Sequence, residues 1–476
     1  MAEPAEPFDV LIVGAGISGV DAAYHLQRRC LGKSYAILEA RERIGGTWDL
    51  FRYPGIRSDS DMYTLGFPFR PWKGDKSIVE GAEIRDYVED TAREYGIDRR
   101  IRFGHRVTRA DWSSDEARWT VEAEAGGEAR RFSAAFLYLC AGYYDYSSGY
   151  RPCWPGETDF RGRIVHPQHW PGDLDHKGRR VAVIGSGATA VTLVPAMAEA
   201  ADHVTMVQRS PSYVVSLPSR DRIAPWIGPR LTRAKNVALG MFFFNLARKR
   251  PAGTRRRLLD LVRKELPPGF DLQTHFGPRY NPWEQRLCLV RDGDLFGAIR
   301  SGKVAIATGE IETFTPGGLR LRSGEEIAAD IVVTATGLNV KLMGGVALTV
   351  DGATAEPAGR LVYKGMMLEG IPNFAFAFGY TNASWTLKCD LTSRYVTRLI
   401  GHMDRHGYRI CTPCLSPEAD VERKPLLDFS SGYIARASAI MPVQGTTGPW
   451  RVPQNYFRDV ATLGLGRVTD EAMEFR

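Results

Sequence analysis

The chain of 476 residues contains one pattern twice: an apolar strand, a glycine-rich loop, a helix and a second apolar strand. The first copy reads FDVLIV, GAGISG, VDAAYHLQRR and SYAILEA, and the second reads RRVAVI, GSGATA, VTLVPAMAEA and HVTMVQRS. Where such a loop opens a helix, the backbone N–H groups and the positive end of the helix dipole can face a pyrophosphate. Two such units predict an α/β fold with two Rossmann-like dinucleotide-binding domains.

A further apolar strand indicates how the two units are connected. The run ADIVVTATGLN follows the second unit and ends in Ala-Thr-Gly. We expect the chain to return from there to the first domain, as in flavoproteins in which one dinucleotide-binding domain is inserted into the other. The predicted division is residues 1–142 and 336–476 for the first domain and residues 143–335 for the second.

Composition is that of a folded globular protein, with 44% hydrophobic and 25% charged residues. The opening MAEPAEPFD is acidic and contains proline, so we expect no secretory signal. Seven scattered cysteines suit a reducing compartment, and a cytoplasmic location is predicted. Cys411 and Cys414 form a lone C-x-x-C without the second pair or His cluster that a zinc site needs, and no metal is predicted.

Positive charge is concentrated in one segment. Residues 220–264 contain 13 Lys or Arg against two Asp, whereas the whole chain has a net charge of +7, so the remainder is net negative. General binding to nucleic acid is therefore not expected. The segment belongs to a predicted helical insertion, residues 215–275, whose apolar stretch is only about half the ~20 residues of a membrane span. It is either a cap over the substrate cavity with its basic face in water, or a helix on an anionic membrane surface.

The first glycine loop is predicted to hold FAD. Gly14, Gly16 and Gly19 open the helix, and Glu39 ends the next strand 20 residues after Gly19, where a carboxylate can hold both ribose hydroxyls. Ser18 stands at the helix start, in place for a phosphate or backbone contact. An N-terminal unit of this kind usually binds FAD; the alternative is a tight turn in an ordinary doubly wound sheet.

The second glycine loop differs at the end of its second strand. Its predicted cofactor contacts are Gly185, Ser186, Gly187, Ala188, Thr189 and Ala190. Arg209 and Ser210 end that strand, in the position that an acidic residue occupies in the first unit. A cation and a hydroxyl favour a 2′-phosphate over a free 2′-hydroxyl, so NADPH is predicted rather than NADH. Arg209 as an ordinary surface arginine is the alternative.

Between the two loops lies FRGRIVHPQHWP, with Phe160, Gly162, His166, Trp170 and Pro171. The order F-x-G-x-x-x-H-x-x-x-W-P resembles the fingerprint of the Baeyer–Villiger monooxygenases, and it ends 14 residues before Gly185, where that family places it. The segment GGTWDLFRYPGIRSD resembles the longer second signature of the same family. Taken alone, the first segment also fits a connecting loop with a core Trp and a hydrogen-bonded His.

The resemblance implies further cofactor contacts. For FAD they are Gly46, Thr47, Trp48, Asp49, Leu50 and Asp59, with the Val107 backbone at the adenine. Arg57 and Ser58 are implied where the nicotinamide of NADP meets the flavin.

The resemblance also implies a catalytic cation. Its position in NPWEQRLCLV is that of Arg286, which Asp59 would orient. Negative charge develops as oxygen is transferred, and an arginine remains protonated and presents a planar fork of donors. Some relatives carry Lys immediately before this arginine, where this chain has Gln285.

The resemblance covers nearly the whole chain and is strongest to the branch that contains the ethionamide-activating monooxygenase of mycobacteria. It implies an NADPH- and O₂-dependent FAD enzyme that converts a small ketone to an ester or lactone and also oxidises sulfides or thioamides. Oxygenation of sulfur or nitrogen as the main activity is the alternative. A membrane-surface module with vestigial oxidoreductase domains is disfavoured by the complete set of loop glycines, and a disulfide reductase by the lack of a dithiol near the first loop.

Overall fold

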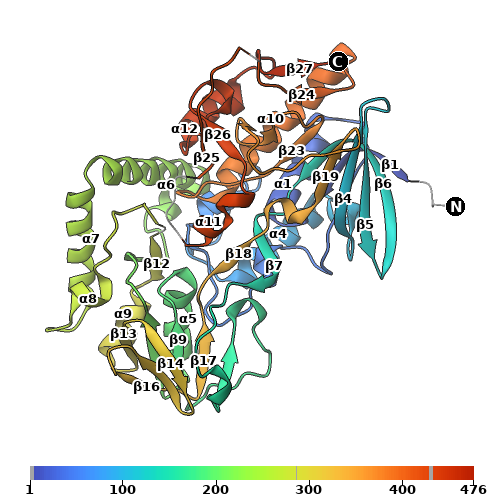
Figure 1. Ribbon diagram of the computed structural model, residues 1–476. Helices are drawn as coiled ribbons and strands as arrows, with labels where there is room; N and C mark the ends of the chain where they lie inside the picture. Colours follow the sequence, from blue (N-terminus) through green and yellow to red (C-terminus); the bar gives the residue numbers. More distant parts are fainter. Residues whose placement is uncertain (1–4, 286, 417, 428–431) are drawn as a thin grey trace.

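The computed structural model describes residues 5–285, 287–416, 418–427 and 432–476, which form two main sheets with helices on their faces (Figure 1). Nine of the described strands make the first sheet, in the order β20–β19–β4–β5–β6–β1–β2–β3, with β23 also paired to β6. These strands are β1 (Glu6–Val13), β2 (Tyr35–Leu38), β3 (Ile101–Arg102), β4 (Arg106–Ser113), β5 (Arg118–Ala125), β6 (Glu128–Leu139), β19 (Ala347–Val350), β20 (Ala353–Thr354) and β23 (Phe374–Phe376).

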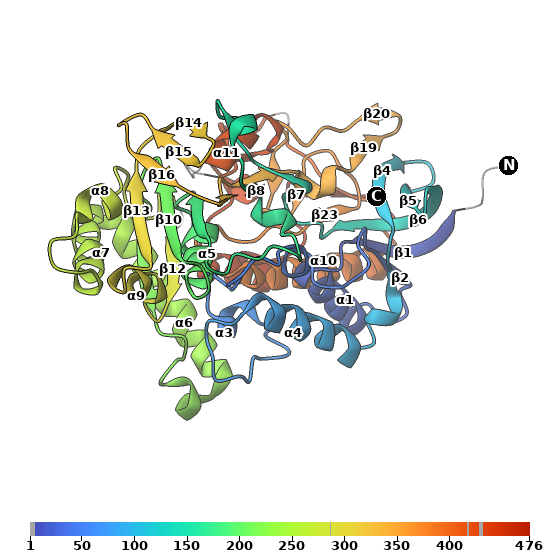
Figure 2. The same cartoon turned by 90° about the horizontal axis from the view of Figure 1, so that it is seen from below.

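The run FDVLIV lies in the parallel strand β1 between β2 and β6, and its last four residues, VLIV, are all apolar because both faces of the sheet are covered there. Val10 and Ile12 belong to one core cluster, which includes side chains of helices α1, α4 and α10. Leu11 and Val13 belong to the cluster on the other face, with Trp119 of β5. Figure 2 shows the three helices together beneath the sheet. Their bounds are α1 (Ile17–Arg29), α4 (Gly81–Glu94) and α10 (Trp385–His406).

The second sheet is parallel throughout, in the order β13–β10–β9–β17–β8. Its strands are β8 (Arg163–Val165), β9 (Arg180–Ile184), β10 (His203–Gln208), β13 (Val304–Thr308) and β17 (Ile331–Thr334). Alternate residues again serve two cores: Val181 and Val183 pack with helix α5, and Ala182 and Ile184 pack under a three-stranded antiparallel sheet. The covering elements are α5 (Ala188–Ala198), α9 (Asp294–Arg300), β14 (Ile311–Thr315), β15 (Gly318–Leu321) and β16 (Glu326–Ala328).

The chain crosses between the two sheets twice, and the crossings pair with each other. β7 (Tyr144–Gly149) leads out of the first sheet and β18 (Leu338–Val340) leads back, and the two are antiparallel partners. After β18, strands β19, β20 and β23 join the first sheet. The paired crossings place the ends of β1 and β9, where the glycine loops begin, on either side of the same region.

The basic segment is mainly helical. It contains α6 (Ala224–Lys249), α7 (Pro251–Glu265) and α8 (Leu272–Phe276), and α6 is kinked at Gly228, where φ is 77°. The predicted insertion 215–275 differs at its start, because β11 (Val214–Leu217) is a strand that pairs with β12 (Cys288–Arg291). Periodicity could not reveal this strand, since its partner lies about 70 residues further along the chain.

The C-terminal part adds short elements beside α10. They are β21 (Val362–Tyr363), β22 (Met367–Leu368), β24 (Cys411–Pro413), β25 (Arg423–Pro425), α11 (Gly432–Ala437), β26 (Val443–Gly445), α12 (Tyr456–Asp459) and β27 (Met473–Phe475). Two one-turn helices, α2 (Thr47–Leu50) and α3 (Met62–Leu65), lie in the segment between β2 and α4.

Candidate functional site

A cavity of about 1210 Å³ lies between the two sheets. Both glycine loops line it, through Gly14 and Gly16 on one side and Gly185 and Gly187 on the other. This volume exceeds that of a typical pocket for a small ligand, about 300–1,000 Å³. The cavity can therefore hold extended ligands that reach from both loops toward its centre.

The first loop is packed so closely that side chains are excluded. At Gly14, where φ is +102°, an added Cβ would lie 2.7 Å from the carbonyl oxygen of Cys140, and at Gly19 it would lie 1.9 Å from the carbonyl oxygen of Gly14. Gly16 faces Gly46 across the loop, with an added Cβ 3.6 Å from the Cα of Gly46. The glycines thus allow close helix–strand packing and leave the loop amides at the cavity, which is the arrangement a pyrophosphate needs.

Glu39 follows β2 and is buried at the edge of the cavity. Its Oε2 accepts a hydrogen bond of 2.7 Å from the Ala15 N–H, and its Oε1 accepts one of 2.9 Å from the Arg41 N–H. Burial raises the pKa of the Glu39 carboxyl, and the two backbone bonds and Arg41 oppose that shift. A carboxylate has about four lone-pair positions, so two remain for a pair of ribose hydroxyls.

Ser18 also lines the cavity, and its side chain has a protein partner. The indole Nε1–H of Trp385 donates a hydrogen bond of 2.8 Å to Ser18 Oγ, and Cys389 Sγ lies 3.3 Å from the same oxygen. The hydroxyl therefore ties the start of α1 to the start of α10, while its backbone stays at the loop.

The second signature divides into residues at the cavity and residues behind it. Gly46, Thr47 and Trp48 line the cavity, and Thr47 Oγ1 lies 3.1 Å from the hydroxyl of Tyr146. Asp49 is buried behind them, where the guanidinium groups of Arg41 and Arg52 hold it, and this pairing outweighs burial and lowers the pKa of its carboxyl.

Leu50, which the resemblance implied at the flavin, packs in the core cluster of the second sheet and is not one of the described residues that line the cavity. Val107, in β4, lines the cavity as implied for an adenine contact.

The second half of that signature reaches the second sheet. Gly55, with φ +76°, packs against α5 so tightly that an added Cβ would lie 2.8 Å from the carbonyl oxygen of Thr192. The buried Arg57 donates to both carboxylate oxygens of Asp294 at the start of α9, at 2.5 and 3.2 Å. Arg57, Ser58 and Asp59 all line the cavity. This segment is therefore held at the boundary between the two halves of the site.

The second loop is more open than the first. Position 185 must be glycine, because φ is +142° and an added Cβ would lie 2.3 Å from the carbonyl oxygen of Ala335. At Gly187, in contrast, no described atom lies within 4 Å of an added Cβ. The hydroxyl of Ser186 donates a hydrogen bond of 2.9 Å to the carbonyl oxygen of Ser210. Of the predicted contacts, Gly185, Ser186, Gly187, Ala188 and Thr189 line the cavity, and Ala190 is buried behind them in α5.

Arg209 and Ser210 follow β10, are exposed and line the same cavity. An exposed guanidinium at the end of the second strand can bind a phosphate on a ribose without breaking a hydrogen bond to any described residue. The structure thus places a cation where the first unit has a buried carboxylate.

The fingerprint residues lie outside the cavity lining, as far as the structure describes it. Phe160 packs in the core beneath β14–β16, and Gly162 is required because an added Cβ would lie 2.3 Å from the carbonyl oxygen of Asp330. His166 packs against Gly149 of β7, its Nδ1 accepts the N–H of Gln168 at 3.2 Å, and burial lowers the pKa of its imidazole.

Trp170 packs against the core of the second sheet, next to Pro171. The side-chain amide of Gln168, inside the fingerprint segment, donates a hydrogen bond of 2.8 Å to the carbonyl oxygen of Asp145 in β7. Within the fingerprint segment, His166 and Gln168 therefore contact the crossing strand β7, and Phe160, Gly162 and Trp170 pack within the second half of the molecule.

Arg286 lies outside the described residues, so its predicted catalytic position stays a prediction. Its neighbours Gln285 and Cys288 both line the cavity. The predicted cap does not, because none of the described residues of 213–284 lines it. Cys411, in β24, and Cys414 are likewise absent from the lining, and burial raises the pKa of their thiols to about 12 and about 11.

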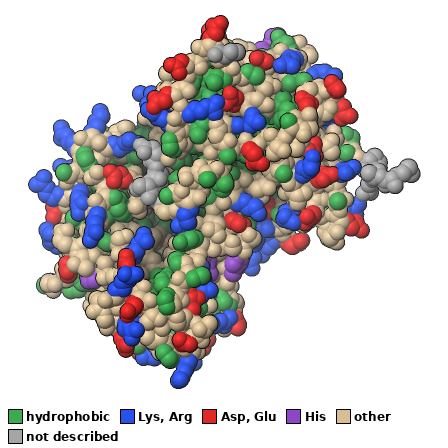
Figure 3. Space-filling view, viewed as in Figure 1, with side chains coloured by type: hydrophobic (Ala, Val, Ile, Leu, Met, Phe, Trp, Pro, Cys, Tyr) green, Lys and Arg blue, Asp and Glu red, His purple; other side chains and the backbone are tan. Residues whose placement is uncertain are grey.

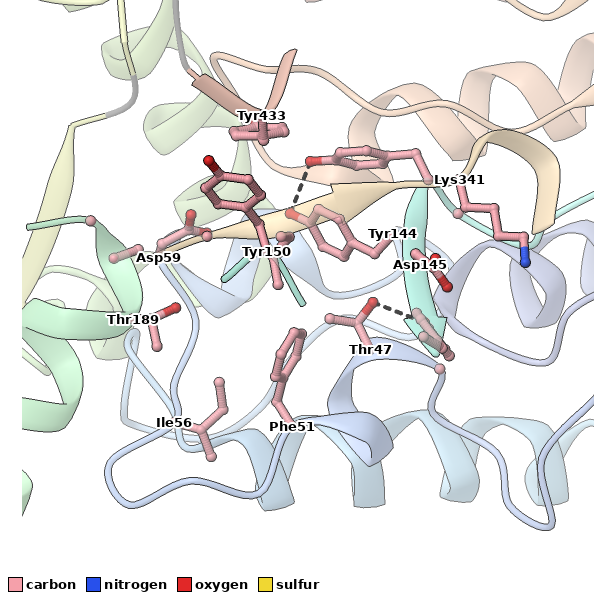
Figure 4. A pocket seen from close by; sticks show the side chains of 18 of the residues that line it. Thr47, Phe51, Ile56, Asp59, Tyr144, Asp145, Tyr150, Thr189, Lys341 and Tyr433 are labelled. Carbon is pink, nitrogen blue, oxygen red and sulfur yellow. Dashed lines mark hydrogen bonds between the residues drawn. The ribbon is translucent and has the colours of Figure 1, made fainter. Parts of the chain in front are cut away.

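Sequence reasoning missed an aromatic wall. Tyr143, Tyr144, Tyr146 and Tyr150 line the cavity, together with Tyr433 and Arg436 of α11 and with Lys341. Figure 4 shows Tyr150 and Tyr433 opposite Ile56 and Phe51. The Arg436 guanidinium lies 3.4 Å from the ring centroid of Tyr150. The run GYYDYSSGY, directly after the end of β6, was the available signal for this wall; the contribution of α11 had none.

These features define a class: an α/β protein in which two dinucleotide-type loops share one cavity. A model of the flavin-binding monooxygenase-like family, FMO-like, matches residues 8–341. The chain belongs to this family.

Its relatives cover nearly all of its length. It is 54% identical to the FAD-containing monooxygenase EthA of Mycobacterium tuberculosis over 99% of this chain and 98% of the relative. It is 44% identical to the probable FAD-binding monooxygenase AlmA of Acinetobacter baylyi over 98% and 96%.

Among solved structures, an oxidized steroid monooxygenase bound to NADP is similar with a TM-score of 0.78 and 23% identity, covering 98% of this chain and 99% of that one. A complex of OTEMO with FAD and NADP gives a TM-score of 0.76 at 20% identity, covering 99% and 100%. These likenesses confirm the predicted two-domain α/β fold. The predicted cofactor pair, FAD and NADP(H), agrees with the names of the relatives and with the contents of these structures and is confirmed at that level.

Proposed function

We propose that this protein is an FAD- and NADPH-dependent Baeyer–Villiger monooxygenase that inserts one atom of O₂ into small ketones to give esters or lactones. The ketone, O₂, NADPH and a proton yield the ester, NADP⁺ and water. We further propose that sulfides or thioamides are oxidised at the same site by transfer of one oxygen atom. FAD, when bound and reduced by NADPH, supplies the activation of O₂.

One observation carries the proposal: the two glycine loops open into a single cavity. Two dinucleotides bound in it can meet without leaving the protein. The first loop, with Gly14, Gly16, Gly19 and the carboxylate of Glu39, fits FAD, and the second loop with Arg209 and Ser210 fits NADPH. The sequence relatives support the flavin, since those at 44–54% identity carry FAD in their names.

The chain's own residues position the reactants. Arg57 and Asp294 join the loop of the first half to α9 of the second, and the neighbouring Ser58 and Asp59 line the cavity. In the aromatic wall Tyr143 stacks on Trp385 with centroids 5.4 Å apart, and we propose that a bound substrate and these rings together displace water from the reacting groups. Low water content strengthens electrostatic stabilisation of the charge that develops during oxygen transfer.

The cation for this step is proposed to be Arg286, oriented by Asp59. Gln285 and Cys288, which line the cavity on either side of it in the chain, support this assignment. A guanidinium keeps its proton at any working pH and offers several donors to one developing anion. Gln285 leaves this single arginine as the cation of the NPWEQRLC segment.

The division of the chain into residues 1–142, 143–335 and 336–476 is retained as part of the proposal. The paired strands β7 and β18 support it, since they adjoin both boundaries. The predicted cytoplasmic location also remains a prediction. No helix in the described part of the chain is both long and apolar enough to cross a membrane.

The proposal is tested with purified full-length protein under ¹⁸O₂. We expect a yellow protein whose NADPH oxidation accelerates with ketones, and an ester that contains one ¹⁸O atom per molecule. A panel of matched sulfides and ketones then separates the two activities. If sulfides are converted and every ketone is left unchanged, heteroatom oxygenation is the main activity and the Baeyer–Villiger assignment is wrong. A colourless protein that does not take up FAD would contradict the flavin site itself.

A further inference from the structure

Helix α6 presents several large apolar side chains to the solvent. Within 224–249, Leu231, Phe242 and Phe243 are 62%, 59% and 52% exposed, and Trp226, before the kink, is 87% exposed. Thirteen large apolar side chains are exposed among the described residues, and eight of them lie between positions 217 and 261. Scattered exposed apolar residues are ordinary, but such a concentration marks a contact surface.

The cations in the middle of α6 face inward instead. The Arg233 guanidinium donates to the carbonyl oxygens of Tyr63, Thr64 and Gly66, at 2.9, 3.0 and 2.6 Å. Lys235 Nζ lies 2.5 Å from Asp221 Oδ2. An ordinary surface helix keeps its large apolar groups toward the core, whereas α6 buries Val237 and Met241 but exposes Leu231, Phe242 and Phe243. Residues 236–247 contain no charged side chain, and the exposed Leu239, Phe242 and Phe243 among them form, with Trp226 and Leu231, the apolar stripe of α6.

A cluster of cations lies at the C-terminal end of α6 and the start of α7. Arg248, Lys249 and Arg250 follow residue 247 directly, and Arg256 and Arg257 come about two turns further, in α7; all five are exposed. Residues 248–264 contain eight Lys or Arg and one Asp. Figure 3 shows Lys and Arg side chains gathered over α6 and α7 at the left edge of the molecule.

We propose that α6 and the start of α7 dock on the surface of a lipid bilayer that contains anionic phospholipids. The apolar stripe enters the boundary between head groups and acyl chains, with Trp226 at that level, and the cations of 248–257 bind lipid phosphates. The helix lies along the membrane, since it is not apolar enough to span it. In Figure 2, α6 projects at the lower edge, away from both sheets, so a flat surface can reach it.

Charge decides against a second copy of the chain as the partner. A symmetric dimer pairs this surface with itself, and residues 220–264 contain 13 Lys or Arg against two Asp, so a second copy offers few carboxylates to pair with the basic cluster. An anionic bilayer instead complements both the stripe and the cluster. The surface is separate from the cavity, because no described residue of 213–284 lines it.

The test is co-flotation of the flavin-loaded full-length protein with vesicles. We expect binding to vesicles of phosphatidylcholine with phosphatidylglycerol at low salt, weaker binding at high salt, and little binding to phosphatidylcholine alone. The variant Trp226→Ser/Phe242→Ser/Phe243→Ser should lower the bound fraction at least about tenfold. Arg256→Glu/Arg257→Glu should lower the bound fraction at low salt and weaken its dependence on salt.

Two controls match these variants. Leu31→Ser changes an apolar side chain that is 84% exposed on the first sheet's side, and Lys177→Glu/Arg179→Glu changes two exposed cations elsewhere. Both should bind vesicles as the parent protein does, and all variants should oxidise NADPH in solution at the parent rate. Absence of flotation with phosphatidylglycerol vesicles overturns the proposal. A second outcome also overturns it: light scattering shows that the parent protein is a dimer, and the triple Ser variant is a monomer that still binds vesicles as the parent protein does.

Discussion

The two glycine loops have the same backbone plan and very different surroundings. In the first, an added Cβ at Gly19 would lie 1.9 Å from the carbonyl oxygen of Gly14, whereas the second has Ala190 at that position without strain. The first strand pair ends in the buried carboxylate of Glu39, which two backbone N–H groups hold; the second ends in the exposed Arg209. The first loop is therefore closely packed, with its carboxylate already hydrogen-bonded, whereas the second loop is loosely packed and its cation is exposed.

This difference fits the tasks proposed for the two sites. A cofactor that stays bound through many turnovers is served by a preorganised, buried site, because little ordering is left to oppose binding. A cofactor that must leave after each turnover is served by an exposed cation and an open loop. We therefore expect FAD to remain bound through purification and NADP(H) to exchange.

The largest expected effect is on oxygen transfer, in a variant that leaves both cofactor-binding loops unchanged. Arg286→Ala should purify yellow and still oxidise NADPH with release of hydrogen peroxide, while ester formation falls by about 10²–10³, the usual loss when one preorganised stabiliser of developing charge is removed. Ester yield and peroxide are measured together. The control Arg279→Ala removes an exposed arginine from the same segment. Near-native ester formation by Arg286→Ala would remove this residue from the mechanism.

The open site is tested at its cation. Arg209→Ala should raise the KM for NADPH by about 10- to 100-fold, because a charge-assisted contact to a 2′-phosphate contributes about 1.5–3 kcal/mol. The KM for NADH should change little. Arg179→Ala, an exposed arginine near the start of β9, serves as control. Equal weakening of both nucleotides would show that Arg209 does not read the 2′-phosphate.

The closed site is tested at its third glycine. Gly19→Ala should weaken FAD binding by at least about tenfold, since overpacking of this kind costs about 1–3 kcal/mol. The ratio of flavin to protein absorbance measures the loss. The matched change in the second loop, Ala190→Gly, should leave the flavin content normal and cost at most about 1 kcal/mol of stability from helix propensity. A full flavin content in Gly19→Ala would contradict the steric argument.

A smaller effect concerns stability near the first loop. Asp21, buried in α1, lies 3.9 Å from His25, which contacts Asp390 of α10 at 2.8 Å. Burial raises the pKa of the Asp21 carboxyl from 3.8 to about 7, and the charge of Asp390 adds to this shift. Because the folded protein holds this proton more tightly, its contribution to stability is complete below about pH 4 and is lost as the pH rises through about 7.

Asp21→Asn keeps the neutral form at every pH. We expect the variant to exceed the parent protein in unfolding free energy at pH 8 by at least about 1 kcal/mol, the equivalent of one pKa unit, and to approach it in mildly acidic solution. Urea titrations at several pH values measure the difference. A constant difference across this range would mean that Asp21 does not titrate there.

Residues near in sequence were predicted well, because short-range patterns encode them. The apolar run VLIV, the glycine positions and the residues at the strand ends follow from local geometry, and the structure brings Gly14, Glu39, Gly185 and Arg209 to one cavity. Motif positions were less informative about contacts. Leu50 and the fingerprint residues Phe160 and His166 belong to cores and crossings rather than to the cavity lining.

The sequence by itself thus determined the two dinucleotide units, their order and the charge at the end of each second strand, since these depend on residues a few positions apart. Only the tertiary structure decided that the fingerprint supports β7, that Arg57 pairs with Asp294 over 200 residues away, and that α11 brings Tyr433 and Arg436 to the cavity. It also decided that in α6 Arg233 points inward while Phe242 and Phe243 point outward. Such contacts depend on which distant segments pack together, and no local periodicity records that choice.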